Sequence, residues 1–154
     1  MAKKEFATPG ALRDCLGEEI SVTDWMEVSQ DRINLFAEAT GDHQWIHLDV
    51  ERAQQESPYR KTIGHGFLTL SLLSVLMQQS VGFKGGLTFA INYGLNRVRF
   101  PAPVPAGSRV RARVKLHALE DIPGGVQATW AITVENDAGE KPVCVAEWVV
   151  RYYT

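Results

Sequence analysis

Strict alternation of apolar and polar residues in the C-terminal half most limits how this chain can fold. Over residues 109–119, charged side chains on one face alternate with valine, alanine and leucine on the other. Segments beginning at Val126 and Cys144 repeat the alternation, and turn sequences at 123–125 and 136–139 separate the three segments. A period of two residues with short turns is typical of an antiparallel meander in which one face of the sheet is buried and the other is exposed to solvent.

The first half of the sequence has helical character. Ser29 is suited to be the N-cap of a helix over 30–40, and Gly41 is suited to end it. A second short helix is expected over 49–56, before a Ser-Pro pair that breaks it. The N-terminal segment 1–19 contains proline and glycine and is expected to be loose.

Residues 64–81 predict a central helix. Apolar side chains cover nearly every direction around it, and a helix that is apolar all round is a buried one. A long strand rich in aromatic and branched residues is expected over 87–100. One buried helix and one antiparallel sheet with an apolar face combine if the sheet curls around the helix. The sequence therefore predicts an α+β fold in one domain over 1–154.

Composition limits the functions open to such a domain. The chain of 154 residues carries 16 Lys+Arg against 18 Asp+Glu, and a net charge of −2 argues against nucleic acid as the main partner. The two cysteines, Cys15 and Cys144, form no disulfide framework or zinc site and suit a reducing cytoplasm. Neither a signal peptide nor a membrane-spanning run is expected.

A first motif brings titratable groups together just after the helix over 30–40. Asp42 and His47 lie five residues apart with His43 between them, and a carboxylate beside an imidazole suits general acid–base catalysis. The alternative is structural: Asp42 satisfies backbone amides and His47 is solvated. A metal site that also uses His43 and Asp49 is a further option, although the spacing is not typical of metal ligands.

A second motif, Gly64-His65-Gly66, opens the apolar helix. Glycine lets a ligand approach the backbone, and the unpaired N–H groups of a helix start can bind an oxyanion or a thioester carbonyl. The alternative is that these glycines only permit tight turning and packing.

Together, the two motifs resemble a known signature. Residues 39–47, followed by Ala53 and by His65-Gly66, are similar to the signature of R-specific enoyl-CoA hydratases in the MaoC-like family. The sequence Gly-Asp-His-Gln-Trp-Ile-His over residues 41–47 is particularly similar to the nodulation protein N branch. The similarity continues downstream through residues 92–107.

The resemblance implies a hot-dog fold, a homodimer, and hydration of 2-enoyl thioesters to R-3-hydroxyacyl products or the reverse dehydration. It implies that Asp42 and His47 activate the water and handle the proton delivered to C2. The backbone N–H of Gly66 or Phe67 would bind the thioester carbonyl. Substrates would be thioesters of coenzyme A or of an acyl carrier, with no metal or redox cofactor and no nucleic-acid or membrane partner.

This chain departs from the family's common pattern at one place. Where Asn-Pro usually follows Gly-Asp-x, it has Gln44-Trp45, and the longer amide and bulky ring bear on acyl selectivity. Tyr93 is expected either to line the acyl pocket or to pack in the core. Two other functions stay open: an acyl-CoA thioesterase, and a non-catalytic module that binds acyl thioesters. The residues expected to bind substrate or support the site are Gln44, Trp45, Gly64, His65 and Tyr93.

Basic residues on the wet face of the meander allow two interpretations. They could contact the phosphates of coenzyme A, but cross-strand pairing with acidic residues on a solvated face is favoured. The same two interpretations apply to Arg97 and Arg99, which have a better chance of lying near the predicted catalytic site. Pairing through the strand over 87–100 is the expected route to a dimer. The basic residues on the solvent-facing side of the segment 109–119 are Arg109, Arg111, Arg113 and Lys115, called the basic row below.

Overall fold

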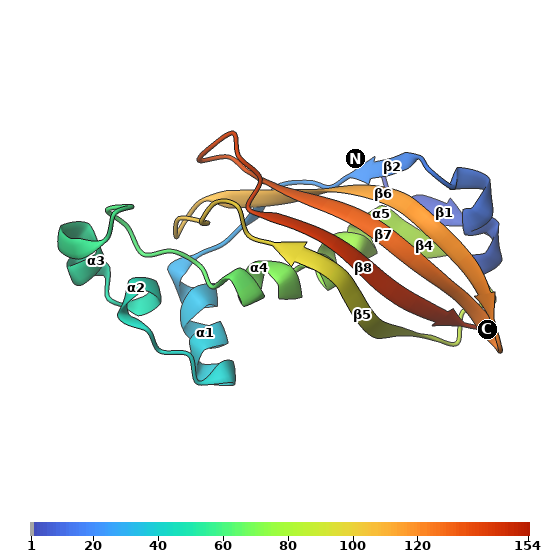
Figure 1. Ribbon diagram of the computed structural model, residues 1–154, viewed down its shortest axis with the longest axis horizontal. Coiled ribbons are helices and arrows are strands. Elements are labelled where there is room, and N and C mark those ends of the chain that lie inside the picture. The colour runs from blue at the N-terminus through green and yellow to red at the C-terminus, as the bar shows by residue number, and fades with distance from the viewer. Residues whose placement is uncertain (1) are drawn as a thin grey trace.

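Within residues 2–154, which this computed structural model describes, six strands form one curved antiparallel sheet (Figure 1). Its order is β2-β6-β7-β8-β5, and β3 pairs with β6 beside β2. Figure 1 shows the sheet bending over α4 and α5, which confirms the expected α+β fold with a sheet around a helix. The strands are β2 (Glu19–Val22), β3 (Met26–Glu27), β5 (Phe89–Arg99), β6 (Arg109–Ile122), β7 (Gly125–Asn136) and β8 (Cys144–Tyr153).

The predicted meander is confirmed. Alternate residues of β7 are buried along its whole length, and Trp130 at its middle is completely enclosed. The β6–β7 turn needs glycine because Gly124 has a φ of 81°, in the left-handed region. The indole Nε1–H of Trp130 donates to the Tyr152 hydroxyl at 3.1 Å, so the one polar atom of this buried ring is satisfied.

The two short helices of the first half are also confirmed. α1 (Gln30–Thr40) begins where the Ser29 hydroxyl accepts a hydrogen bond from the Arg32 N–H, and it ends at Gly41 with a φ of 80°. α3 (Val50–Glu56) begins at an aspartate cap, Asp49. Between them lies one turn of helix, α2 (Trp45–Leu48).

The central helix differs from the prediction over 64–81. It consists of α4 (Gly66–Ser71) and α5 (Leu73–Ser80), with an interruption at Leu72. The Ser71 hydroxyl donates to the carbonyl of Phe67 one turn earlier, an interaction that often bends helices. The helix is also not buried all round, because the Phe67 side chain is 69% exposed.

The N-terminal segment is ordered rather than loose. β1 (Lys4–Phe6) pairs in parallel with β4 (Val81–Phe83), and the 3-10 helix η1 (Pro9–Cys15) follows it. The reason is hydrophobic: Leu12 and Cys15 are buried in the same core cluster as the sheet. This segment therefore closes one end of the fold.

One apolar surface lies uncovered along β5 and the adjoining helix face. Both faces of β5 are largely exposed, although the strand is rich in apolar residues. None of the helices described over residues 2–154 is long and apolar enough to cross a membrane. The large exposed apolar side chains here are Phe67, Val75, Leu87, Phe89, Ile91, Tyr93, Leu95 and Phe100.

Candidate active site

His47 is held in a defined tautomer. Its Nδ1 lies 2.7 Å from the carbonyl oxygen of Ile63, and a carbonyl can only accept a hydrogen bond. Nδ1 therefore carries the proton, and Nε2 presents a lone pair. No residue in the described part of the chain hydrogen-bonds to this Nε2, which leaves it able to accept a proton from a ligand.

The backbone of His47 is also fixed. The side-chain amide of Gln30 donates to the His47 carbonyl at 2.7 Å, and its oxygen accepts from the Thr62 hydroxyl at 2.5 Å. Gln30 thereby ties α1, α2 and the segment before α4 together. Sequence reasoning did not identify Gln30, because nothing in the spacing of residues 30, 47 and 62 shows that they meet.

The surroundings of His47 favour the neutral ring. Burial lowers the pKa of His47 below its ordinary value, and a charge on His65 would lower it further. The hydrogen bond to Ile63 and the nearby Asp42 carboxylate act in the opposite direction without reversing the shift. A neutral imidazole with a free Nε2 is a general base at neutral pH.

His65 stacks on His47. The two rings are 3.8 Å apart between centroids with an interplanar angle of 24°. The Nε2–H of His65 donates to the backbone carbonyl of Asp42 at 3.1 Å, which fixes the loop that carries this aspartate. Phe36 covers His65 at 5.0 Å between ring centroids. His65 thus positions both members of the predicted pair.

Asp42 completes the group. Its Oδ1 accepts the backbone N–H of Gln44 at 3.3 Å, which orients the exposed carboxylate. One side-chain donor atom each from Asp42, His47 and His65 lie within 4.8 Å of one another. The structure therefore brings Asp42 and His47 together, as predicted.

The metal set considered from the sequence is not assembled. His43 turns away to Glu38, with 2.9 Å between Nε2 and Oε1, and the hydrogen bond from that carboxylate raises the pKa of His43. Asp49 caps α3 by accepting the N–H of Arg52. Asp42, His47 and His65 do form a compact group, in which the Nε2–H of His65 already donates to the backbone carbonyl of Asp42.

The start of α4 lies beside this group. Gly64 is anchored by its N–H, which donates to the Val104 carbonyl at 2.8 Å. A Cβ on Gly66 would lie 3.1 Å from the Phe100 ring, so a side chain there would crowd it. As the first residues of the helix, Gly66 and Phe67 carry N–H groups that no intrahelical carbonyl can reach.

A cleft of about 300 Å³ opens next to these residues. His47 and Gly66 line it, and the Phe100-Pro101 turn forms its opposite wall. His47 and the start of the helix α4 therefore line one space.

The remaining predicted residues lie outside the cleft. Gln44 is exposed at the start of α2. The Trp45 ring stacks with the guanidinium of Arg52, at 4.1 Å from the ring centroid. Tyr93 is 56% exposed and lies under the guanidinium of Arg151 at 3.5 Å. The expectation that Tyr93 packs in the core is wrong, and Tyr93 does not line the cleft that contains His47.

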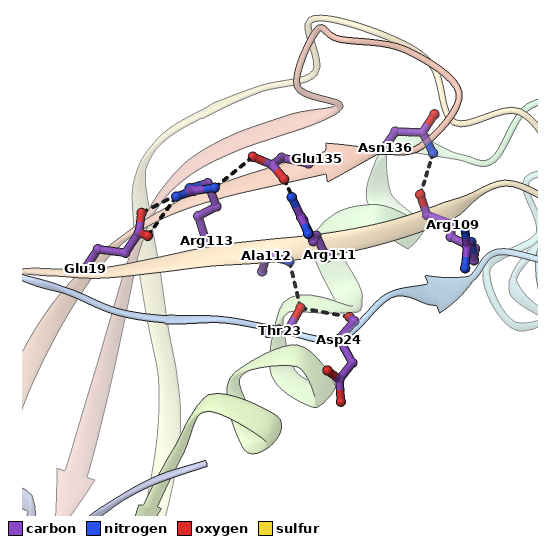
Figure 2. Close-up of polar contacts among 9 residues, drawn as sticks. All are labelled: Glu19, Thr23, Asp24, Arg109, Arg111, Ala112, Arg113, Glu135 and Asn136. Atoms are coloured by element: carbon purple, nitrogen blue, oxygen red, sulfur yellow. Dashed lines mark hydrogen bonds and ion pairs between the residues drawn. The ribbon is translucent and has the colours of Figure 1, made fainter. Parts of the chain in front are cut away.

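The three arginines of the basic row on β6 are paired with acidic side chains, and Figure 2 shows the pairs made by Arg111 and Arg113. Arg111 donates to Glu135 at 2.7 Å, and Arg113 bridges Glu19 at 2.9 Å and Glu135 at 3.3 Å. Arg109 pairs with Asp137 at 2.8 Å. The favoured interpretation, cross-strand pairing, is confirmed for these three arginines.

Comparison with known proteins identifies the class. The family model described as "MaoC like domain" matches residues 13–137, so the chain belongs to the MaoC-like dehydratase family. It is 53% identical over 150 residues to 3-hydroxyacyl-thioester dehydratase Z of Mycobacterium tuberculosis, covering 97% of this chain and 98% of that protein. Nodulation protein N of Rhizobium leguminosarum bv. viciae is 44% identical over 135 residues, covering 87% and 84%.

A solved structure agrees with these relatives. The unliganded R-hydratase PhaJ1 from Pseudomonas aeruginosa has a TM-score of 0.71 and 25% identity, over 90% of this chain and 81% of that chain. The hot-dog fold implied by the sequence resemblance is therefore confirmed.

Proposed function

We propose that this chain is a hydro-lyase that adds water to 2-enoyl thioesters, giving R-3-hydroxyacyl thioesters, and that it catalyses the reverse dehydration. The observation that carries the proposal is a buried His47 whose Nδ1 is bound to the Ile63 carbonyl; His47 lines the same cleft as Gly66 at the start of α4 and lies beside Asp42. The 53% identity to a 3-hydroxyacyl-thioester dehydratase supports the reaction class.

The proposed chemistry follows from these positions. Asp42 and His47 hold one water, and His47 Nε2 takes a proton from it as the oxygen forms a bond to C3. Electron density moves from the double bond to the thioester oxygen, and the protonated pair then returns a proton to C2. Backbone N–H groups of Gly66 or Phe67 stabilise the enolate oxygen, by about 3 kcal/mol per donor in comparable sites.

We place the acyl chain between α5 and β5. Two hollows of about 480 Å³ each lie there and share Ser74, Asn92 and Trp148. Among the described residues, α5 and β5 leave this seam open to solvent on one side. An apolar chain would replace water against Met77 and Val150 at the far end.

We infer further that the active protein is a homodimer through β5. In the described sheet, β5 pairs with β8 and is the terminal strand of the order. Its free edge offers backbone hydrogen bonds, and the exposed apolar side chains beside it supply an area that a second copy would cover.

The test measures loss of enoyl-thioester absorbance with crotonyl-CoA and longer 2-enoyl-CoAs, with free thiol release followed in parallel. Loss of absorbance without thiol release supports the proposal. Thiol release from saturated acyl-CoA would instead support a thioesterase, and tight binding without either signal would support a binding module.

A further inference from the structure

We propose that Arg97 and Arg99 of β5 form a binding site for the phosphate groups of coenzyme A. The inference rests on the proposed function, since it specifies the carrier of the acyl group. It adds a recognition site for the nucleotide end, outside the cleft that holds His47.

Arginines on the outer face of the sheet differ in whether a carboxylate pairs with them. The three arginines of β6 are each within 3.3 Å of a carboxylate oxygen. Over residues 2–154, by contrast, neither Arg97 nor Arg99 has a carboxylate within the 4.0 Å of an ion pair. Arg99 donates only to the carbonyl of Val98, at 2.7 Å. These two guanidinium groups keep their charge available for an anion.

Arg97 and Arg99 lie beside a hollow with partly apolar walls. Arg97 and Arg99 are two residues apart on one strand, so their side chains leave the same face. They border a hollow of about 390 Å³ whose other walls include Pro101, Ala131 and Val145. Two cations beside an apolar floor match a nucleotide, because the phosphates pair with arginine and the base covers apolar surface.

This hollow adjoins the cleft that contains His47. Pro101 lines both the hollow and the cleft that contains His47, so the two spaces adjoin at one residue. Figure 1 shows that the end of β5 approaches α4. In coenzyme A, the pantetheine arm separates the thioester from the phosphates. The proposed site lies on such a path, with the thioester at α4 and the phosphates at the end of β5.

One carboxylate also borders the hollow. Glu147 is the cross-strand neighbour of Arg97. Its Oε1 lies 3.8 Å from His117 Nε2, on the side away from β5. The charge of Glu147 therefore repels an anion in the hollow, although Glu147 forms no ion pair with Arg97. Removing this charge should strengthen anion binding, the opposite of the effect of removing the arginines.

The experiment titrates adenosine 3′,5′-bisphosphate into the protein by calorimetry. We compare wild type with Arg97→Ala/Arg99→Ala, and use Arg13→Ala/Arg109→Ala as the matched control. The control also removes two positive charges, from exposed arginines that are already paired with Asp121 and Asp137. We expect binding to weaken about tenfold or more in the first variant and less than about twofold in the control. Glu147→Gln should strengthen binding by about twofold.

A kinetic comparison separates this site from the reaction itself. With crotonyl-CoA, the Arg97/Arg99 variant should raise KM about tenfold and leave kcat unchanged. With the crotonyl thioester of N-acetylcysteamine, which lacks phosphates, both constants should match wild type.

The outcomes are distinct. Equal weakening in both double variants, or no binding of the bisphosphate by wild type, overturns the phosphate site. A KM that rises equally for the phosphate-free thioester also overturns it. If no enoyl thioester turns over but the bisphosphate binds through Arg97 and Arg99, the proposed function fails and the phosphate site stands.

Discussion

β7 and β5 have similar composition but different surroundings. Both are rich in apolar residues, yet every second residue of β7 is buried, whereas both faces of β5 are largely exposed. β7 has a paired strand on each edge, whereas β5 pairs only with β8. The apolar pattern thus shows which strands have side chains suited to burial. The topology of the sheet decides whether other parts of the same chain cover those side chains. In this fold, the uncovered part is where a second copy and the acyl chain are proposed to bind.

The largest expected effects are losses of activity at His47 and Asp42, which lie on neither β5 nor β7. His47→Gln and Asp42→Asn should each lower kcat/KM for crotonyl-CoA by about 10³-fold, since each removes a proton-transfer group. Thermal midpoints should stay within about 2 °C of wild type, because the amide introduced by His47→Gln can still donate to Ile63 and Asp42 is exposed. A variant that keeps full activity would contradict the assigned role.

The next prediction applies one substitution to both strands. Ile132 on β7 is 2% exposed and Ile91 on β5 is 45% exposed. Ile132→Ala should lower the free energy of unfolding by about 2–4 kcal/mol at any protein concentration. Ile91→Ala should cost less than about 1 kcal/mol in dilute protein and more as concentration rises, because only a dimer buries it. Chemical denaturation at two concentrations measures both; equal, concentration-independent losses would break the comparison.

A charge on β5 tests the proposed dimer directly. Ile91→Asp places a carboxylate on the apolar surface that the second copy would cover. The dimer dissociation constant should rise at least about tenfold, measured by sedimentation. Leu35→Asp is the control, since Leu35 is 70% exposed on α1, away from the sheet edge. The same shift in both variants, or a wild type that is monomeric throughout, would refute a β5 interface.

The pH dependence reports on the burial of His47. Because its pKa is lowered in the folded protein, the unfolded chain binds the proton first as pH falls below 6.5. The stabilising contribution of neutral His47 is therefore complete above pH 6.5 and is lost as pH falls through its folded pKa. The free energy of unfolding should decrease over that interval, and His47→Gln should remove that part of the decrease.

Activity should also decrease as the pH falls. Wild-type kcat/KM should stay level from about pH 7.5 to 6.5 and fall at lower pH, when His47 is protonated. A decline that begins above about pH 7 would show that His47 is not held neutral in this way.

The smallest expected effect concerns a buried thiol on β8. Burial raises the pKa of Cys144 to about 11, so the thiolate is scarce at neutral pH. A thiol reagent such as dithiobisnitrobenzoate should react with Cys144 only after unfolding by denaturant. Rapid reaction in the folded protein would show that β8 opens more readily than its complete pairing with β7 and β5 indicates.

Local rules predicted much of this fold. The caps at Ser29, Gly41 and Asp49 depend on single residues, and the alternation in β6 to β8 depends on neighbours two apart. Asp42 and His47 are joined by a short turn, so their proximity also followed from sequence.

Features that depend on distant contacts escaped prediction. The stacking of His65 on His47 requires the start of α4 to meet α2, and the role of Gln30 requires three segments to meet. Tyr93 faces away from the core because alternation along β5 puts it on the face opposite Asn92, and only the pairing of β5 with β8 shows which of these faces is the outer one. Asn92 instead faces inward and accepts a hydrogen bond from the Trp148 indole.

The most direct test of the central claim is the configuration of the product formed from crotonyl-CoA. The protein is incubated with this substrate, and the 3-hydroxybutyryl-CoA is resolved by chiral chromatography alongside the His47→Gln variant. The account predicts the R product from wild type, no release of free coenzyme A, and almost no product from the variant. The S product, or equal product from both proteins, would contradict it.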